Sequence, residues 1–464
     1  MIENSFKDLV EQTFDFPQTE FDVNDDKLMF NNIELMDIVQ QYGVPLKITY
    51  LPKIGEKIRF ANDLFLGAMK KHEYNGDYTY CYCTKSNHFS FVVEEALKHD
   101  AQLEISYGFD VQIIRSLERK NKILKDIKVI CNGHKTEFYR EQIIALINAG
   151  FSNVIPVADT IEEIQYYNKH VKGPVDIGIR LATEEEPNFE FYTSRLGIRN
   201  HKIIDQVLPI LDDNDHLNLK MLHFFVDTGM KDTAYYWTEF SKALSLYIDL
   251  KKLFPSLTDL NIGGGFPFKD ALDFDYDFEY MVDEIIFKIK EACKEANIDV
   301  PNIFTEFGKF SVAESGASIY KVMFQKQQND RENWYMINGS IMSSIPDIWG
   351  MDQKFIVLPL NKWNDKSEIV NIGGLSCDNE DYYNSEIHKK QLFLPKMKDG
   401  EELYIGFFHT GAYQDALAGY GGVKHCLIPA PKHIIINKDE NGKLVHHQYR
   451  GEQMVEPMLE ILGY

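Results

Sequence analysis

Apolar and polar positions follow two different periods through the first two thirds of the chain. Short runs rich in β-branched and aromatic residues predict strands. Between them, stretches such as 89–100, 139–150 and 278–296 place apolar residues three and four positions apart, which predicts helices. The eight predicted strands occupy 78–85, 101–107, 128–132, 153–159, 175–182, 219–229, 260–267 and 302–309.

Eight strand–helix units over about 230 residues fit an α/β fold of the (β/α)8 TIM-barrel type, whose usual length is about 250 residues. An open, doubly wound sheet is the alternative. The polar residues favour the barrel, because nearly every predicted strand ends in a chemically usable residue and barrel active sites are built at that rim. These residues are Lys85, Glu104, Asn132, Asp159, Arg180, Asp227 or Thr228, Gly263 to Gly265, and Glu306.

The pattern changes after residue 310. Short strand-like pieces separated by Asn, Asp, Gly and Pro predict a second, mostly antiparallel β domain. The chain is therefore expected to comprise an N-terminal segment, 1–45, that packs with the β domain or the barrel, a barrel over 46–310, and a β domain over 311–464.

The amino-acid composition argues against several functional classes of protein. Hydrophobic residues make up 44% and charged residues 26% of the chain, as in globular proteins, and a net charge of −22 disfavours nucleic-acid binding. No apolar run reaches the roughly 20 residues needed to cross a bilayer, and the acidic N-terminus lacks a signal region, so no membrane association is expected. Six scattered cysteines without metal-site or disulfide spacing predict reduced thiols, no metal centre and a cytoplasmic location.

Three rim groups suit a phosphate-bearing aldehyde cofactor. The backbone N–H groups of Gly263 to Gly265 can approach a phosphate closely, although a triple glycine also makes a tight turn. Strict alternation places Lys85 on the inward face with Cys83, where a Schiff base would remove the cost of burying an ammonium. A lysine that reaches solvent is the simpler alternative. Glu306 can hold a pyridine nitrogen protonated or form a salt bridge at the barrel mouth.

Five short motifs, spread over a match from about residue 40 to 425, carry a family resemblance. They are Y-C-T-K-S-N at 82–87, G-G-G-F-P at 263–267, E-F-G-K at 306–309, C-D-N-E-D at 377–381 and G-A-Y-Q at 411–414. Together they resemble the fold-type III, pyridoxal phosphate (PLP)-dependent amino acid decarboxylases, which include ornithine, diaminopimelate and biosynthetic arginine decarboxylases. Within that family the chain is most similar to the arginine decarboxylases, through the longer stretches 189–198, 344–360 and 406–414.

The resemblance implies roles for the rim residues. Lys85 would bind the PLP aldehyde as a Schiff base, and Glu306 would pair with the pyridine nitrogen. Glu104 and Arg180 would lie near the ring. The other residues implied to surround the cofactor and its phosphate are Phe225, Thr228, Gly263, Gly264, Gly265, Lys309 and Tyr413.

The same resemblance implies a homodimer, in which the loop at 377–381 enters the partner's active site. There Cys377 would protonate the carbon left after decarboxylation, and Asp378 would contact the cationic end of the substrate. Asp378 forms an acidic cluster together with Glu380 and Asp381, and this cluster suits a guanidinium group. The alternative for Cys377 is an inert buried thiol.

The chain departs from the family pattern in three places. Phe225 replaces a histidine that usually stacks on the cofactor; phenylalanine can cover a pyridine face but carries no charge. Lys309 replaces an arginine and offers a point charge in place of a bidentate fork. Cys377 follows Lys309 by only 68 positions, which leaves no room for the helical insertion of long bacterial arginine decarboxylases.

The predicted activity is PLP-dependent α-decarboxylation of a small cationic amino acid, first of all L-arginine to agmatine and CO2 in polyamine and spermidine biosynthesis. Ornithine, citrulline, diaminopimelate or carboxynorspermidine is the alternative substrate. A PLP-binding regulatory homologue without turnover is the alternative from another class; Phe225 and Lys309 favour it, whereas Lys85, Cys377 and Asp378 oppose it.

Overall fold

The computed structural model describes residues 5–183, 194–214, 216–226, 229–231, 233–330, 332–384, 391–398 and 400–464. The chain divides into two compact units. The barrel unit comprises Ile54–Pro267 and Tyr276–Ser311. The β unit comprises Met1–Lys53, Phe268–Asp275 and Val312–Tyr464.

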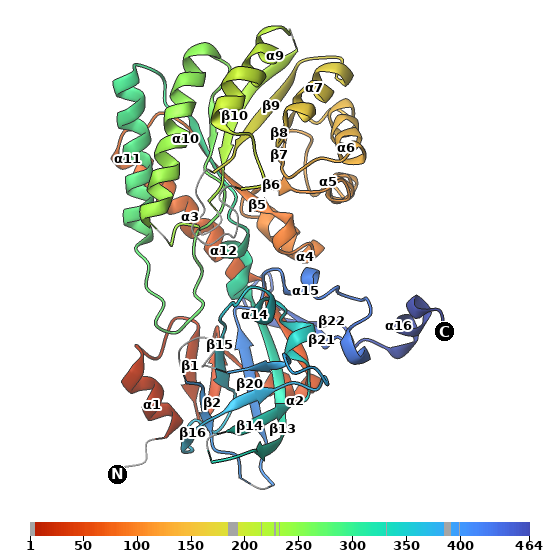
Figure 1. The fold of residues 1–464 in the computed structure, drawn as a ribbon. Helices are drawn as coiled ribbons and strands as arrows, with labels where there is room; N and C mark the ends of the chain where they lie inside the picture. Colours follow the sequence, from red (N-terminus) through yellow and green to blue (C-terminus); the bar gives the residue numbers. More distant parts are fainter. Residues whose placement is uncertain are drawn as a thin grey trace. The chain divides into compact units, whose positions relative to one another are not determined.

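Eight parallel strands close into a barrel in the barrel unit, as the sequence predicts (Figure 1). Each strand pairs with the next one along the chain, and the last pairs with the first. The strands are β5 (Tyr78–Cys83), β6 (Gln102–Ile105), β7 (Lys128–Cys131), β8 (Asn153–Ala158), β9 (Val175–Leu181), β10 (Leu217–Phe224), β11 (Asp259–Asn261) and β12 (Asn302–Thr305).

Helices follow the strands, and several begin at side-chain caps. Thr136, Thr160 and Asp277 each accept a hydrogen bond from a backbone N–H three positions later, which satisfies a donor that the first helical turn leaves free. The helices of this unit are α3 (Pro52–Lys71), α4 (Ser90–Leu97), α5 (Asp110–Arg119), α6 (Glu137–Asn148), α7 (Ile161–His170), α8 (Asn200–Lys202), α9 (Leu208–Asp212), α10 (Thr233–Leu253), α11 (Phe278–Ala296) and α12 (Gly308–Val312).

Side chains fill the barrel interior. One buried cluster joins inward-facing residues of five strands: Cys81, Ile130, Ile155, Val157, Met221 and Phe304. The barrel is therefore a packed core, and space for a ligand has to lie at its rim.

The β unit is built on a nine-stranded sheet in which most neighbours are antiparallel, as predicted. The pairs β14–β17 and β4–β21 are parallel. The strands of this sheet are β4 (Leu46–Tyr50), β13 (Gly316–Gln327), β14 (Asn333–Ile337), β15 (Ile356–Pro359), β17 (Asn371–Gly373), β18 (Tyr382–Tyr383), β20 (Leu403–Phe408), β21 (Lys432–Lys438) and β22 (Leu444–Arg450).

Smaller elements complete the β unit. The described strands outside the large sheet are β1 (Phe21–Asn24), β2 (Lys27–Phe30), β3 (Ile33–Glu34), β16 (Ser367–Ile369) and β19 (Phe393–Pro395). The described helices are α1 (Phe6–Thr13), α2 (Leu35–Tyr42), α13 (Ile341–Ser344), α14 (Asp347–Gly350), α15 (Gln414–Leu417) and α16 (Val455–Leu462).

The expected barrel boundary at residue 46 differs from the structure. Strand β4 lies between β13 and β21, and its backbone pairs with both. Without β4, the facing edges of those two strands would leave buried N–H and C=O groups unpaired. A short apolar strand looks the same in either sheet, so its partners could not be read from the local pattern.

None of the described helices is long and apolar enough to cross a membrane.

A testable consequence concerns the β-unit core. Trp363 is fully buried, packs on Phe6 and Phe16 at centroid distances of 5.0 and 5.3 Å, and donates Nε1–H to the Pro359 carbonyl at 2.8 Å. Trp363→Ala should lower the free energy of unfolding by about 3–5 kcal/mol, because it leaves a cavity and an unpaired carbonyl. Urea denaturation measures this loss of unfolding free energy. The matched control is Trp349→Ala, at a tryptophan 53% exposed, and an equal loss in both variants would contradict the assignment.

Candidate active site

Lys85 and Glu104 form an ion pair at the barrel rim. Strand β5 ends at Cys83, and Lys85 sits in a single 3-10 turn, Thr84–Ser86. The turn is closed by the Ser86 hydroxyl, which donates to the Cys83 carbonyl at 2.7 Å. Lys85 Nζ lies 2.8 Å from both carboxylate oxygens of Glu104, which is completely buried on β6.

The turn corrects one expectation. Strict strand alternation would have placed Lys85 on the face of Cys81 and Cys83, but the chain has already left the strand at this point. The turn therefore sets the direction of the lysine, and its side chain stays 40% exposed. Both thiols are buried, and burial raises the pKa of each well above its ordinary value, so they act as small core residues.

Glu306, which directly follows β12, is buried and surrounded by hydrogen-bond donors. Asn132 Nδ2 lies 2.8 and 2.9 Å from its two carboxylate oxygens, and Asn261 Nδ2 lies 2.6 Å from one of them. His223 Nε2 lies 3.3 Å from the other oxygen. Three separate strand ends, those of β7, β10 and β11, therefore converge on one carboxylate.

These donors keep the Glu306 carboxylate charged. Burial by itself raises the pKa of this carboxyl group. The charge and hydrogen bond of His223, followed by the charge of Lys85, outweigh burial and lower the pKa of Glu306 below its ordinary value. The carboxylate therefore stays ionised across the physiological pH range.

Sequence reasoning missed part of this network. Asn132 was expected only as a rim residue, and the contacts of His223 and Asn261 with Glu306 were not foreseen. A signal for Asn261 did exist, because an amide inside an otherwise apolar predicted barrel strand has to find a buried partner.

The triple glycine turn is shaped by close backbone contacts. A Cβ at Gly264 would lie 2.7 Å from the Glu306 carbonyl oxygen, and Gly263 and Gly265 have φ values of +69° and +99°. The Gly263 N–H donates to Asn261 Oδ1 at 2.9 Å. Among the described residues, none accepts a hydrogen bond from the N–H groups of Gly264 and Gly265. The turn is thus required sterically and also leaves two donors available for an anion.

Phe225 lies against this turn. Cβ atoms placed on Gly263 and Gly264 would meet its side chain at 3.1 and 3.6 Å. The Arg180 guanidinium, carried by β9, lies 5.8 Å from the Phe225 ring centroid. Lys309 is in the first turn of α12, three positions after Glu306. Thr228 lies outside the described residues.

The predicted residues of the β unit have contrasting environments. Cys377 and Glu380 are exposed, and Asp378 is half-buried. Asp381 is buried, and its two oxygens accept backbone hydrogen bonds from Met342 and Ser376, both at 2.9 Å. The Asp381 carboxylate is therefore committed to holding the chain, unlike the free acidic group that the sequence suggested.

Tyr413 has a left-handed backbone conformation, with φ of +65°, immediately before α15. This conformation is uncommon for a residue with a side chain and fixes how the loop enters the helix.

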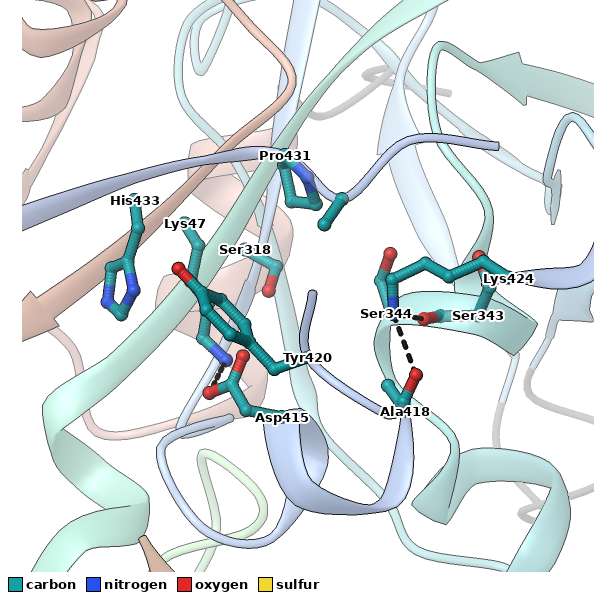
Figure 2. A pocket seen from close by; sticks show the side chains of 11 residues that line it. Lys47, Ser318, Ser343, Ser344, Asp415, Ala418, Tyr420, Lys424, Pro431 and His433 are labelled. Carbon is teal, nitrogen blue, oxygen red and sulfur yellow. Dashed lines mark hydrogen bonds and ion pairs between the residues drawn. The ribbon is translucent and has the colours of Figure 1, made fainter. Parts of the chain in front are cut away.

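A second polar cluster lies inside the β unit (Figure 2). Lys47 pairs with Asp415, and Lys424 Nζ donates to the Ser343 and Ala418 carbonyls at 3.2 and 2.8 Å. The cavity between these groups measures about 20 Å3, room for about one water molecule. We therefore regard this cluster as part of the packing of the β unit and not as a substrate site.

The rim residues fit the cofactor implied by the sequence. An amine, an ionised carboxylate within electrostatic reach of it, and two free backbone donors match the aldehyde, pyridine nitrogen and phosphate of PLP. His223 Nδ1 and Asn132 Oδ1 are buried without a hydrogen-bond partner among the described residues, which leaves additional polar capacity at the rim.

Comparison with known proteins gives the same assignment. The family model described as "Pyridoxal-dependent decarboxylase, pyridoxal binding domain" matches residues 67–313. A biosynthetic arginine decarboxylase of Synechocystis is 22% identical over 93% of this chain and 83% of its own.

Two solved structures are similar along nearly the whole chain. A biosynthetic arginine decarboxylase from Campylobacter jejuni has a TM-score of 0.80 at 20% identity and covers 96% of this chain and 89% of its own. A diaminopimelate decarboxylase from M. jannaschii, in complex with L-lysine, has a TM-score of 0.75 at 18% identity. It covers 94% of this chain and 95% of its own. With the family model spanning more than half of its residues, the chain belongs to the pyridoxal-dependent decarboxylases and is a PLP-dependent carboxy-lyase.

Proposed function

We propose that this enzyme removes the α-carboxyl group of L-arginine and releases agmatine and CO2 for polyamine biosynthesis. The observation that carries the proposal is the rim constellation of Lys85, Glu306 and the glycine turn in a chain that aligns over nearly its full length with arginine decarboxylases. When bound, PLP supplies an electron sink for the electrons left on Cα after CO2 departs.

We propose that Lys85 is the amine that binds the cofactor aldehyde and is exchanged for the substrate amine. Glu104 orients this amine through two contacts of 2.8 Å. Because Glu104 is buried and fixed on β6, it holds the Lys85 amine at the rim. The Lys85 side chain is partly exposed there, so an incoming substrate can reach it.

Glu306 is proposed to hold a proton at the pyridine nitrogen. A carboxylate whose pKa lies below its ordinary value stays anionic, and an anion stabilises the protonated ring nitrogen opposite it. This favours decarboxylation over racemisation, because a protonated pyridine is the stronger electron sink.

The phosphate is proposed to bind the N–H groups of Gly264 and Gly265, with Lys309 as an additional positive charge. Phe225 is proposed to cover one face of the ring, and Arg180 to lie beside it. The role of Thr228 stays a prediction.

For the substrate's guanidinium we propose Asp378 and Glu380, because their carboxylates are at least partly exposed, whereas both Asp381 oxygens are engaged by backbone donors. Cys377 as the proton donor to product, Tyr413 at the phosphate, the homodimer with shared sites and the cytoplasmic location stay predictions.

The proposed substrate is tested with a panel. Purified holoenzyme is given L-arginine, L-ornithine, L-citrulline, L-lysine and meso-diaminopimelate in separate reactions, and products are identified by mass. Agmatine should form with a kcat/KM at least about tenfold above that for the other substrates, equivalent to about 1.4 kcal/mol of transition-state discrimination. A preference for another substrate would overturn the arginine assignment, and bound PLP without CO2 release from any of them would indicate a silent homologue.

Replacing the lysine tests its covalent role. Lys85→Ala should abolish turnover and remove the visible absorption band of the bound cofactor, because no amine remains next to Glu104. Lys98→Ala, at a surface lysine paired with Glu95, is the control and should retain both. A borohydride-reducible band that persists in Lys85→Ala would identify a different lysine.

Removing only the charge tests Glu306. Glu306→Gln keeps the size of the side chain but no longer holds the ring nitrogen protonated, so kcat should fall by about 10²–10³-fold. PLP content, measured after alkaline release, should remain close to one per chain. Glu94→Gln, which breaks a surface pair with Lys122, serves as the control. A kcat within twofold of wild type would rule out the proposed role.

A further inference from the structure

Two cysteines of the β unit lie in direct contact. Cys377 follows β17, and Cys426 lies in the short turn His425–Leu427. Their Sγ atoms are 3.4 Å apart although the residues are separated by 49 positions. Both are free thiols and both are exposed. The remaining four cysteines, Cys81, Cys83, Cys131 and Cys293, are buried.

The pair differs from the buried thiols in the chemistry available to it. A disulfide bond is about 2.05 Å long, so the two sulfurs need to approach by only about 1.4 Å to form one. A soluble oxidant can reach these sulfurs, whereas burial protects the other four.

A proton acceptor stands next to the pair. A ring nitrogen of His425 and the two sulfurs all lie within 4.8 Å of one another, and His425 Nε2 is 3.8 Å from Asp378 Oδ2. Since the thiolate is the nucleophile in thiol–disulfide exchange, an imidazole that takes up the thiol proton assists the first step.

We propose that Cys377 and Cys426 form a reversible intramolecular disulfide when the enzyme meets a low-molecular-weight disulfide such as oxidised glutathione. One thiolate attacks the glutathione disulfide, forms a mixed disulfide and expels one glutathione thiolate. The second thiolate then attacks the protein sulfur and expels the other. One S–S bond is broken and one is formed, the two cysteines are oxidised, and the two thiol protons pass to the two glutathione molecules.

The consequence for activity rests on the proposed function. As the predicted proton donor to product, Cys377 has a thiol proton only in the reduced state. Oxidation removes that proton and fixes the loop after β17 to the turn at Cys426. The disulfide therefore switches the decarboxylase off, whereas formation of the bond itself depends only on the geometry of the two sulfurs.

The experiment uses the holoenzyme and a Cys426→Ser variant, equilibrated with a series of reduced-to-oxidised glutathione ratios in the presence of EDTA. Remaining thiols are alkylated, and non-reducing peptide mapping by mass spectrometry quantifies the Cys377–Cys426 crosslink. Agmatine production is measured on the same samples, before and after dithiothreitol.

Wild-type enzyme should form the crosslink and lose activity by about 10²-fold or more, which is the usual contribution of a positioned proton donor. Crosslink formation and loss of activity should have the same midpoint in the glutathione series. Dithiothreitol should restore the activity. Cys426→Ser should be as active as reduced wild type, form no crosslink and keep its activity at the wild-type midpoint. At more oxidising ratios it should lose activity only together with a glutathione adduct on Cys377, which the peptide map identifies. If no substrate is turned over, the crosslink still tests the thiol pair, so failure of the proposed function is seen separately.

Three results would overturn the disulfide. The first is absence of the crosslink under the most oxidising ratio. The second is inactivation of Cys426→Ser at the same ratio as wild type without a glutathione adduct on Cys377. The third is seen in parallel samples without EDTA: inactivation only by added Zn2+, reversed by EDTA without any crosslink, would assign the two thiols and His425 to a metal site instead.

Discussion

A buried carboxylate that stays charged is the constraint on which the rest of the site depends. Placed alone in the barrel, Glu306 would take up a proton, because burial penalises its ionised form. The charge and hydrogen bond of His223, followed by the charge of Lys85 and the hydrogen bond of Asn132, prevent this by lowering the pKa of the carboxyl group. Polar side chains therefore occupy this part of the barrel rim in place of apolar packing, and they hold a fixed negative charge there.

Closure of the barrel is what makes this network possible. Asn132 and Glu306 are 174 positions apart, and His223 and Glu306 are 83 apart. Parallel strands in a closed ring carry all their C-terminal ends to one rim, so short polar side chains from distant segments reach one point. The short 3-10 turn directly after β5 holds Lys85 against Glu104 on the rigid strand β6.

The β unit handles its polar groups in a different way. Asp381 accepts backbone hydrogen bonds on both carboxylate oxygens, which fixes the start of β18. Cys377, four positions before Asp381, is exposed and lies against Cys426, whereas the cysteines of the barrel unit are buried. Thiols are thus buried in the barrel unit and exposed at Cys377 and Cys426 in the β unit, whereas the Asp381 carboxylate of the β unit serves packing.

Local patterns in the sequence determined the eight barrel strands, the mostly antiparallel β unit and the rim positions of Lys85, Glu104 and Glu306, because alternation and apolar runs report how each segment is buried. Tertiary structure alone decided the partners of β4, the turn that aims Lys85, the convergence of Asn261 and His223 on Glu306, and the commitment of Asp381. The physical reason is that burial leaves a local trace in composition, whereas a hydrogen-bond partner tens or hundreds of positions away is chosen only when the sheets close.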